Sequence, residues 1–84
     1  MAYRIVFEPR AAKEFEALDG QMRRRVLKAL QKLATDPFSS ANVKALHGGG
    51  YRIRVGDWRV LYSVQDDILL ILVLKIAHRR EAYR

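Results

Sequence analysis

The sequence lacks cysteine, so no disulfide bond can stabilise the fold and no thiolate can act as a nucleophile or a metal ligand. Proline and glycine are scarce, with two and five residues, which argues against a disordered chain. Half of the 84 residues are hydrophobic, which is enough for one compact core. We therefore expect a single folded domain over residues 1–84.

Long apolar runs are also absent. The longest run, Ile68–Leu74, has seven residues and is far too short to cross a bilayer as a helix. The N-terminal stretch MAYRIVFEPR lacks the apolar segment of a signal peptide. We therefore expect a soluble protein of the reducing cytoplasm with no membrane partner, and we expect no metal or other cofactor.

Acidic residues are few. Nine Asp and Glu stand against sixteen Lys and Arg, which gives a net charge of +7. A small domain this basic is expected to bind a polyanion, which is nucleic acid, an acidic protein, or both. Arginine outnumbers lysine, and its guanidinium group suits bidentate contacts to phosphate. The alternative is that the charge serves solubility alone.

The spacing of the apolar residues predicts the element order β-α-α-β-β-β. The predicted strands are Ala2–Phe7, Tyr51–Val55, Trp58–Val64 and Ile68–Ile76, and the predicted helices are Arg10–Leu18 and Gln21–Ala34. This order is typical of an α+β sandwich, in which two helices cover one face of a four-stranded, mainly antiparallel sheet. The last strand is apolar at nearly every position, which predicts a central strand buried on both faces. The glycine-rich segment Phe38–Gly50 is predicted to be a loop.

The stretch YRIRVGDWRVLY, residues 51–62, alternates apolar and polar residues on both sides of Gly56-Asp57. This pattern predicts two strands joined by a two-residue turn. Arg54 then lies directly opposite Arg59, and both share with Arg52 the sheet face away from the helices. Because like charges placed opposite each other destabilise a hairpin, this arrangement favours a binding role over mere solubility.

The basic tail emerges beside these arginines if the last strand pairs with the strand that follows the turn. The tail residues concerned are His78, Arg79, Arg80 and Tyr83. A basic surface with a histidine and a tyrosine fits a phosphodiester, and it also fits a base stacked on the tyrosine ring. Leu70, Leu72 and Leu74 are predicted to form an exposed apolar strip on the same face, which indicates a protein partner.

The element order, the hairpin and the ending A-H-R-R-E-A-Y resemble the RelE/ParE superfamily of type II toxin–antitoxin toxins, with more likeness to the RelE branch. The resemblance covers essentially the whole chain. RelE toxins are similar in fold to microbial ribonucleases and cut mRNA in the ribosomal A site, whereas ParE toxins poison DNA gyrase. The resemblance implies an endoribonuclease that inhibits translation, with an acidic cognate antitoxin, mRNA and ribosomal RNA as its partners.

The resemblance also implies roles for single residues. Arg52 and Arg54 match two basic family positions, often lysines, on the first hairpin strand. Arg59 matches a family arginine that follows the turn. An arginine after the last core strand is matched by Arg79, with Arg80 as an alternative, and the C-terminal tyrosine of the family is matched by Tyr83.

The implied reaction is attack of a ribose 2′-OH on the adjacent phosphate, which gives a 2′,3′-cyclic phosphate and a free 5′-OH. In this reaction Arg59 and Arg79 would stabilise the developing charge, Arg52 and Arg54 would hold the RNA backbone, and Tyr83 would orient a nucleotide.

One departure from the family pattern concerns the general base. Arginine has a pKa above about 12 and does not serve as a general base in the way that a lysine can. Histidine is the residue type that titrates near neutral pH, and His78 is the histidine near the arginines. Either His78 assists proton transfer, or the toxin works by charge stabilisation and orientation.

Structural alternatives for the site residues stay open at the level of sequence. Arg52 and Arg54 also fit the ordinary charged positions of an edge strand. Arg59 also fits an ion pair with Glu8 or Asp57.

The tail and the whole chain have alternatives of their own. Tyr83 also fits a C-terminal anchor on the core, and His78 fits an exposed tail position. For the whole chain, the alternatives are a ParE-like gyrase inhibitor that cuts nothing and a basic module that only docks RNA or an antitoxin.

Overall fold

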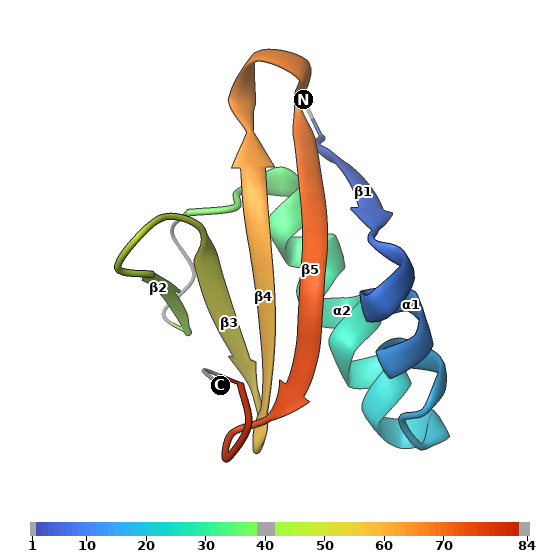
Figure 1. Ribbon diagram of the computed structural model, residues 1–84. Coiled ribbons are helices and arrows are strands. Elements are labelled where there is room, and N and C mark those ends of the chain that lie inside the picture. The colour runs from blue at the N-terminus through green and yellow to red at the C-terminus, as the bar shows by residue number, and fades with distance from the viewer. Residues whose placement is uncertain (1, 39–41, 83–84) are drawn as a thin grey trace.

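A computed structural model describes residues 2–38 and 42–82 of the chain (Figure 1). The elements follow one another as β1 (Arg4–Phe7), α1 (Pro9–Glu16), α2 (Gly20–Thr35), β2 (Val43–Ala45), β3 (Tyr51–Val55), β4 (Trp58–Gln65), the short 3-10 helix η1 (Asp66–Ile68) and β5 (Leu70–His78). All five strands belong to one mixed sheet with the spatial order β1-β5-β4-β3-β2. β1 runs parallel to β5, and every other neighbouring pair is antiparallel.

The predicted α+β fold with two helices is confirmed, but the predicted number of strands is wrong, because the sheet has five strands and not four. The additional strand is β2, which lies inside the predicted loop and pairs with β3 at the edge of the sheet. Two of its three residues, Lys44 and Ala45, are exposed, so the strand carries no apolar alternation. Short, exposed edge strands of this kind are common because they limit pairing with other chains.

Each helix begins where a local signal places it. Pro9 occupies the first turn of α1, where a missing N–H group does no harm. The Asp19 carboxylate accepts a hydrogen bond from the Met22 N–H (2.8 Å) and so caps the start of α2. Neither helix of the described chain is long and apolar enough to span a membrane.

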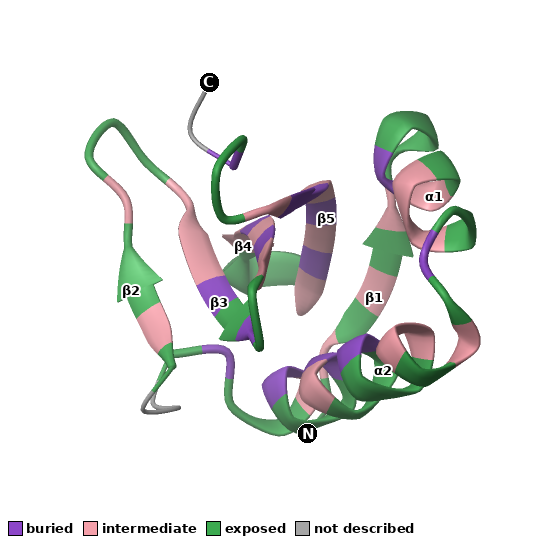
Figure 2. Cartoon of the chain, turned by 90° about the horizontal axis from the view of Figure 1, so that it is seen from below, coloured by how far each residue is buried: buried purple, intermediate pink, exposed green. Residues whose placement is uncertain are grey.

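The core lies between the helices and one face of the sheet, and Figure 2 shows both helices on that side. Its largest fully buried side chains are Tyr62, Leu30, Leu33, Ile71, Ile76, Val26, Val60 and Val73. The helix residues among them repeat at the spacing of one apolar stripe, and the strand residues repeat every second position except between Val73 and Ile76, where the step is three residues. The prediction that the helices cover the apolar face of the hairpin is therefore confirmed.

The predicted register of the hairpin is confirmed as well. Arg54 pairs with Arg59, and Val55 pairs with Trp58 across the turn. Gly56 has a φ of 60°, and a positive φ at the first turn residue is the reason why glycine is favoured there. The sheet face opposite the helices carries Arg52 and Arg59, and we call it the arginine face.

Strand β5 is central, as predicted, but it is not buried on both faces. The residues that face the helices are buried, whereas Leu70, Leu72 and Leu74 are half-buried. They are therefore not the exposed strip that the sequence predicted. No helix lies on the arginine face in the described part of the chain, so only one side of this uniformly apolar strand is covered.

A β-bulge interrupts the pairing of β5 with β4. Leu72 lies opposite Ser63, but Lys75 lies opposite Leu61, which makes Leu74 an extra residue. Because successive residues of a strand alternate between faces, the extra residue reverses the pattern beyond it. Lys75 therefore lies on the arginine face. In a strand without the bulge, Leu74 and Ile76 would lie on that face instead.

Candidate functional site

The turn Gly56-Asp57 brings two of the predicted site arginines together. Its carbonyl oxygens accept hydrogen bonds from both residues: the Gly56 oxygen from Arg59 Nη1 (3.1 Å), and the Asp57 oxygen from the Arg79 backbone N–H (2.8 Å). Arg54 is the cross-strand partner of Arg59. The hairpin end of the sheet thus gathers three guanidinium groups from β3, β4 and the tail.

Arg59 keeps its full charge available to a ligand. Its Nη1 also donates to the Trp58 carbonyl oxygen (3.0 Å), so both of its recorded bonds go to backbone carbonyls. Among the described residues no carboxylate forms an ion pair with it, and the sequence-level alternative of a pair with Glu8 or Asp57 finds no support. The two carbonyls fix the direction of the side chain without neutralising it.

Arg79 does have a carboxylate neighbour. Its Nη1 lies 3.9 Å from Asp57 Oδ1, and the two side chains are 56% and 67% exposed. An ion pair this long and this exposed contributes little stability and is screened by salt. Asp57 therefore orients the Arg79 side chain but does not hold it against a competing phosphate.

Arg52 and Arg54 occupy different surroundings. Arg52 Nη1 donates to the Asn42 carbonyl oxygen (2.8 Å), and its Nε is buried without a hydrogen-bond partner in the described chain. Arg54 is exposed, and the structure records no side-chain hydrogen bond for it among the described residues. Of the two arginines, Arg54 is the one free to meet a ligand.

The tail folds back over the arginine face instead of extending away from it (Figure 2). Lys75 Nζ donates to the Glu81 carbonyl oxygen (3.0 Å), and the Glu81 N–H donates to the His78 carbonyl oxygen (2.8 Å). Ala82 is only 2% exposed as a result. The tail thus covers part of a face that the sequence predicted to be open, while Tyr83 lies outside the described residues.

His78 lies apart from the arginines of the turn. Arg59 pairs with Ala77, so the next residue of β5 faces the helix side, where the His78 and Trp58 rings meet edge to face with centroids 5.7 Å apart. The bulge in β5 produces this orientation. His78 Nδ1 accepts a long hydrogen bond from the Arg80 N–H (3.4 Å).

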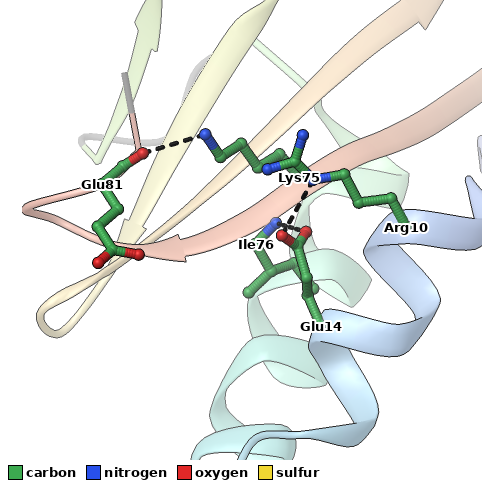
Figure 3. A network of polar contacts seen from close by, with 5 residues as sticks. All are labelled: Arg10, Glu14, Lys75, Ile76 and Glu81. Atoms are coloured by element: carbon green, nitrogen blue, oxygen red, sulfur yellow. Dashed lines mark hydrogen bonds and ion pairs between the residues drawn. The ribbon is translucent and has the colours of Figure 1, made fainter. Parts of the chain in front are cut away.

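A cleft of about 530 Å³ opens between α1 and the tail, and we call it the α1–tail cleft. Its lining residues with ionisable side chains are Arg10, Glu14, Lys75, His78, Arg80 and Glu81. Figure 3 shows Glu14 reaching from α1 to β5: Oε1 accepts from the Ile76 backbone N–H (2.9 Å), and Oε2 accepts from Arg10 Nε (3.2 Å). Sequence reasoning missed Glu14, since nothing in a helical stretch rich in charged residues shows that one carboxylate reaches a strand 62 positions away.

Within the described part of the chain, no group of three or more His, Asp or Glu side chains could hold a metal ion. The turn itself presents guanidinium groups, which donate hydrogen bonds and attract anionic oxygens.

Comparison with known proteins identifies the family. Residues 5–83 match the family described as the ParE toxin of type II toxin–antitoxin systems, parDE. The chain belongs to the RelE/ParE family of type II toxins. This match confirms the family that the hairpin and the tail predicted.

Relatives of this toxin with RelE names fit the predicted branch. The mRNA interferase toxin RelE of Escherichia coli is 27% identical over 84 residues, which cover 98% of this chain and 88% of that protein. Among solved structures, the archaeal RelE–RelB complex from Pyrococcus horikoshii aligns with a TM-score of 0.81 and 30% identity, over 98% of this chain and all of that one. The intact E. coli RelBE complex gives 0.82 and 28%, over 92% and 96% of the two chains.

The predicted site residues of this RelE/ParE toxin thus divide into three groups. Arg54, Arg59 and Arg79 meet at the hairpin turn, Arg52 is engaged with the segment before β2, and His78 and Arg80 line the α1–tail cleft.

Proposed function

We propose that this toxin is a ribosome-dependent mRNA endonuclease. The observation that carries the proposal is the meeting of Arg59 and Arg79 at the Gly56-Asp57 turn, where backbone carbonyls aim one guanidinium group and the tail supplies the other. Support also comes from the E. coli relative that is named an mRNA interferase.

The reaction is an internal transfer within the RNA chain. The ribose 2′-oxygen forms a bond to the adjacent phosphorus, the bond from phosphorus to the 5′-oxygen breaks, and the 2′ proton leaves while the 5′-oxygen gains one. Negative charge builds up on the phosphate oxygens between these events. Arg59 and Arg79 stabilise that charge, and a well-placed donor contributes about 3 kcal/mol in such sites.

The group that accepts the 2′ proton must differ from that in a toxin with lysines in the hairpin, because this chain has arginines there. Arg54 holds the RNA backbone, Arg52 stays bound to the Asn42 carbonyl oxygen, and neither arginine accepts the proton. His78 faces Trp58 on the other side of the sheet from Arg59. This placement favours catalysis by charge stabilisation and by orientation of the 2′-oxygen, with the ribosomal complex as the environment for proton transfer.

The proposed protein partner is an acidic cognate antitoxin. The solved relatives from P. horikoshii and E. coli are complexes of RelE with RelB. The present chain has a net charge of +7, and Val6 on β1 remains 38% exposed beside the half-buried Leu72 of the arginine face. An acidic segment with apolar side chains fits both features.

Cleavage of mRNA in programmed ribosomes tests the nuclease proposal. We expect the wild type to cut at the A site and both Arg59→Ala and Arg79→Ala to cut on the order of 10²–10³-fold more slowly, because each removes a donor to the phosphate. Arg24→Ala, which removes an exposed arginine of α2 away from the turn, serves as the matched control and should cut normally. Cleavage that is equally fast in all four proteins would overturn the assignment.

The second candidate function is inhibition of DNA gyrase without cutting. The matched family is described by ParE and parDE, and the chain has arginines at the two hairpin positions where RelE toxins often have lysines. A gyrase supercoiling assay separates the two functions. Intact mRNA together with blocked supercoiling would support the ParE-like function and make the arginine face a docking surface.

A further inference from the structure

A second basic cleft, of about 400 Å³, lies between α2 and the edge of β3, and we call it the α2–β3 cleft. Four of its lining residues are cationic: Arg25, Lys28, Lys32 and Arg54. None of the described residues that line it is acidic. All four cationic residues are exposed, so their charged groups are accessible from solvent.

The geometry of α2 explains why three of these cations share the cleft. Arg25, Lys28 and Lys32 are spaced at three and four residues, which places their side chains on one face of the helix. The neighbouring residues Val26, Leu30 and Leu33 of α2 are buried in the core, so the helix and its row of cations have a fixed position relative to β3. From Arg25 to Lys32 the helix rises by about 10 Å.

The α2–β3 cleft reaches the hairpin turn of the candidate active site through Arg54 and Gly56. Arg54 lines the cleft and is the cross-strand partner of Arg59. On the other side of the turn, Arg25 lies so close to Gly56 that a Cβ atom there would be 3.1 Å from Arg25 Nη1. One turn thus separates the cationic row of α2 from the arginines that we assign to catalysis.

The lining of the cleft indicates which kind of partner it fits. Its larger apolar residues, Ile53 and Val55, are only 4% and 6% exposed, so they offer little area to the apolar face of a peptide helix. None of the described lining residues has an aromatic ring on which a base could stack. What remains accessible is a row of positive charge, which suits the repeated anionic groups of a nucleic-acid backbone.

We infer that the α2–β3 cleft binds the sugar–phosphate backbone of the single-stranded RNA that flanks the cleaved bond. This inference rests on the proposed endonuclease function and extends its substrate site past Arg54 onto α2. The contacts are to phosphates and carry no sequence preference, so the cleft adds affinity and direction but not codon choice.

Binding of uncleavable RNA of two lengths tests this inference. The probes are uridine oligonucleotides of about 4 and about 12 nucleotides, in which 2′-O-methyl groups block the attacking oxygen. The test variant is Lys28→Gln/Lys32→Gln, and the control is Lys13→Gln/Arg24→Gln, which removes the same charge from exposed helix positions outside the cleft. Fluorescence anisotropy at several salt concentrations gives the affinity of each pair.

We expect the test variant to bind the longer RNA on the order of tenfold more weakly than the wild type at about 0.15 M salt, with a salt slope smaller by about 0.7 for each lost phosphate contact. Its affinity for the shorter RNA should match that of the control variant. An equal loss in both variants, or a loss that does not depend on RNA length, would overturn the inference. The same holds if an acidic peptide binds the cleft and RNA does not.

Failure of the cleft assignment and failure of the proposed nuclease function give different results in these experiments. If the test variant binds long RNA normally while cleavage in ribosomes still needs Arg59 and Arg79, the cleft assignment fails and the nuclease stands. If long RNA needs the cleft but no mRNA is cut, the nuclease fails and the RNA-binding surface stands.

Discussion

The candidate site depends at the residue scale on how single guanidinium groups are held. The Arg59 side chain is fixed by two backbone carbonyls. The Arg79 backbone is fixed on the turn by its own N–H group, and its side chain lies 3.9 Å from the exposed Asp57 carboxylate. Backbone partners hold a side chain in place without cancelling its charge, which is what a phosphate-binding group requires. The alternation of the hairpin predicts that Arg54 and Arg59 face each other, but it does not predict which carbonyls hold them.

Tyr62 gives a prediction about pH at the same scale. Its hydroxyl is fully buried and donates to the Pro37 carbonyl oxygen (2.7 Å). Burial, with smaller effects of Tyr51 and Asp36, raises the pKa of Tyr62 above the ordinary tyrosine value. The unfolded chain therefore loses this proton near pH 10, at about the ordinary value, while the folded protein keeps it. The stabilisation is present below about pH 10 and is lost as the pH rises above that value.

Denaturant unfolding between neutral pH and about pH 11 tests this prediction. Tyr62→Phe should be less stable by about 1–2 kcal/mol at neutral pH, because the buried Pro37 carbonyl loses its donor. The variant should also lack the Tyr62 part of the alkaline decline, so its deficit relative to the wild type should shrink as the pH rises. Tyr51→Phe, which leaves the Tyr62 bond in place, is the control. A deficit that stays constant with pH would contradict the assignment.

The β-bulge in β5 shows at the element scale why part of the site could not be predicted. Strict alternation along an apolar strand assigns each residue to a face, and one extra residue at Leu74 reverses that assignment for the strand end. His78 consequently meets Trp58 and not Arg59. The sequence from Leu70 to Leu74 contains no glycine, proline or polar residue that would reveal the bulge.

Strand β2 and the second face of β5 were unpredictable for a related reason. A three-residue edge strand gains its order from pairing with β3 and not from its own pattern. An unbroken apolar run, in turn, does not show whether one face or both are covered, since that depends on where the helices end up. By contrast, both helices and the hairpin register that places Arg54 opposite Arg59 were predictable, because local spacing and a two-residue turn determine them.

The Glu14 side chain joins two elements and gives a prediction about stability. Its Oε1 accepts the Ile76 N–H on a part of β5 that lies beyond the pairing with β1, and the side chain is 25% exposed. Glu14→Ala should lower the free energy of unfolding by about 1.5–3 kcal/mol, because a charged acceptor is removed from a partly buried amide. Hydrogen exchange of the Ile76 amide should become faster as well.

The matched control for this prediction is Glu16→Ala. Glu16 is exposed on the same helix, and its recorded hydrogen bond uses its backbone oxygen, which the substitution keeps. Equal stability changes in the two variants would show that helix charge, and not the bond to β5, accounts for the effect.

Charge is distributed unevenly at the scale of the whole molecule. The hairpin end of the sheet carries Arg54, Arg59 and Arg79, whereas the β4–β5 connection at the opposite end carries Asp66 and Asp67 (Figure 1). The eight residues of β4 separate these ends by about 26 Å. Since the Debye length is about 8 Å at physiological salt, the acidic end has little influence on an anion bound at the hairpin end.

This separation predicts that RNA affinity follows local charge and not net charge. Lys28→Gln and Asp67→Asn each change the net charge by one unit, in opposite directions. If net charge governed binding, the two variants would change the affinity for long RNA by similar factors in opposite directions.

We expect instead a loss of about fourfold for Lys28→Gln at about 0.15 M salt and no more than a small change for Asp67→Asn. Lowering the salt concentration to about 0.01 M lengthens the Debye length to about 30 Å, so the effect of Asp67→Asn should then appear. An Asp67→Asn effect as large at physiological salt as at low salt would mean that the charge of the whole molecule, and not the α2–β3 cleft, attracts the RNA.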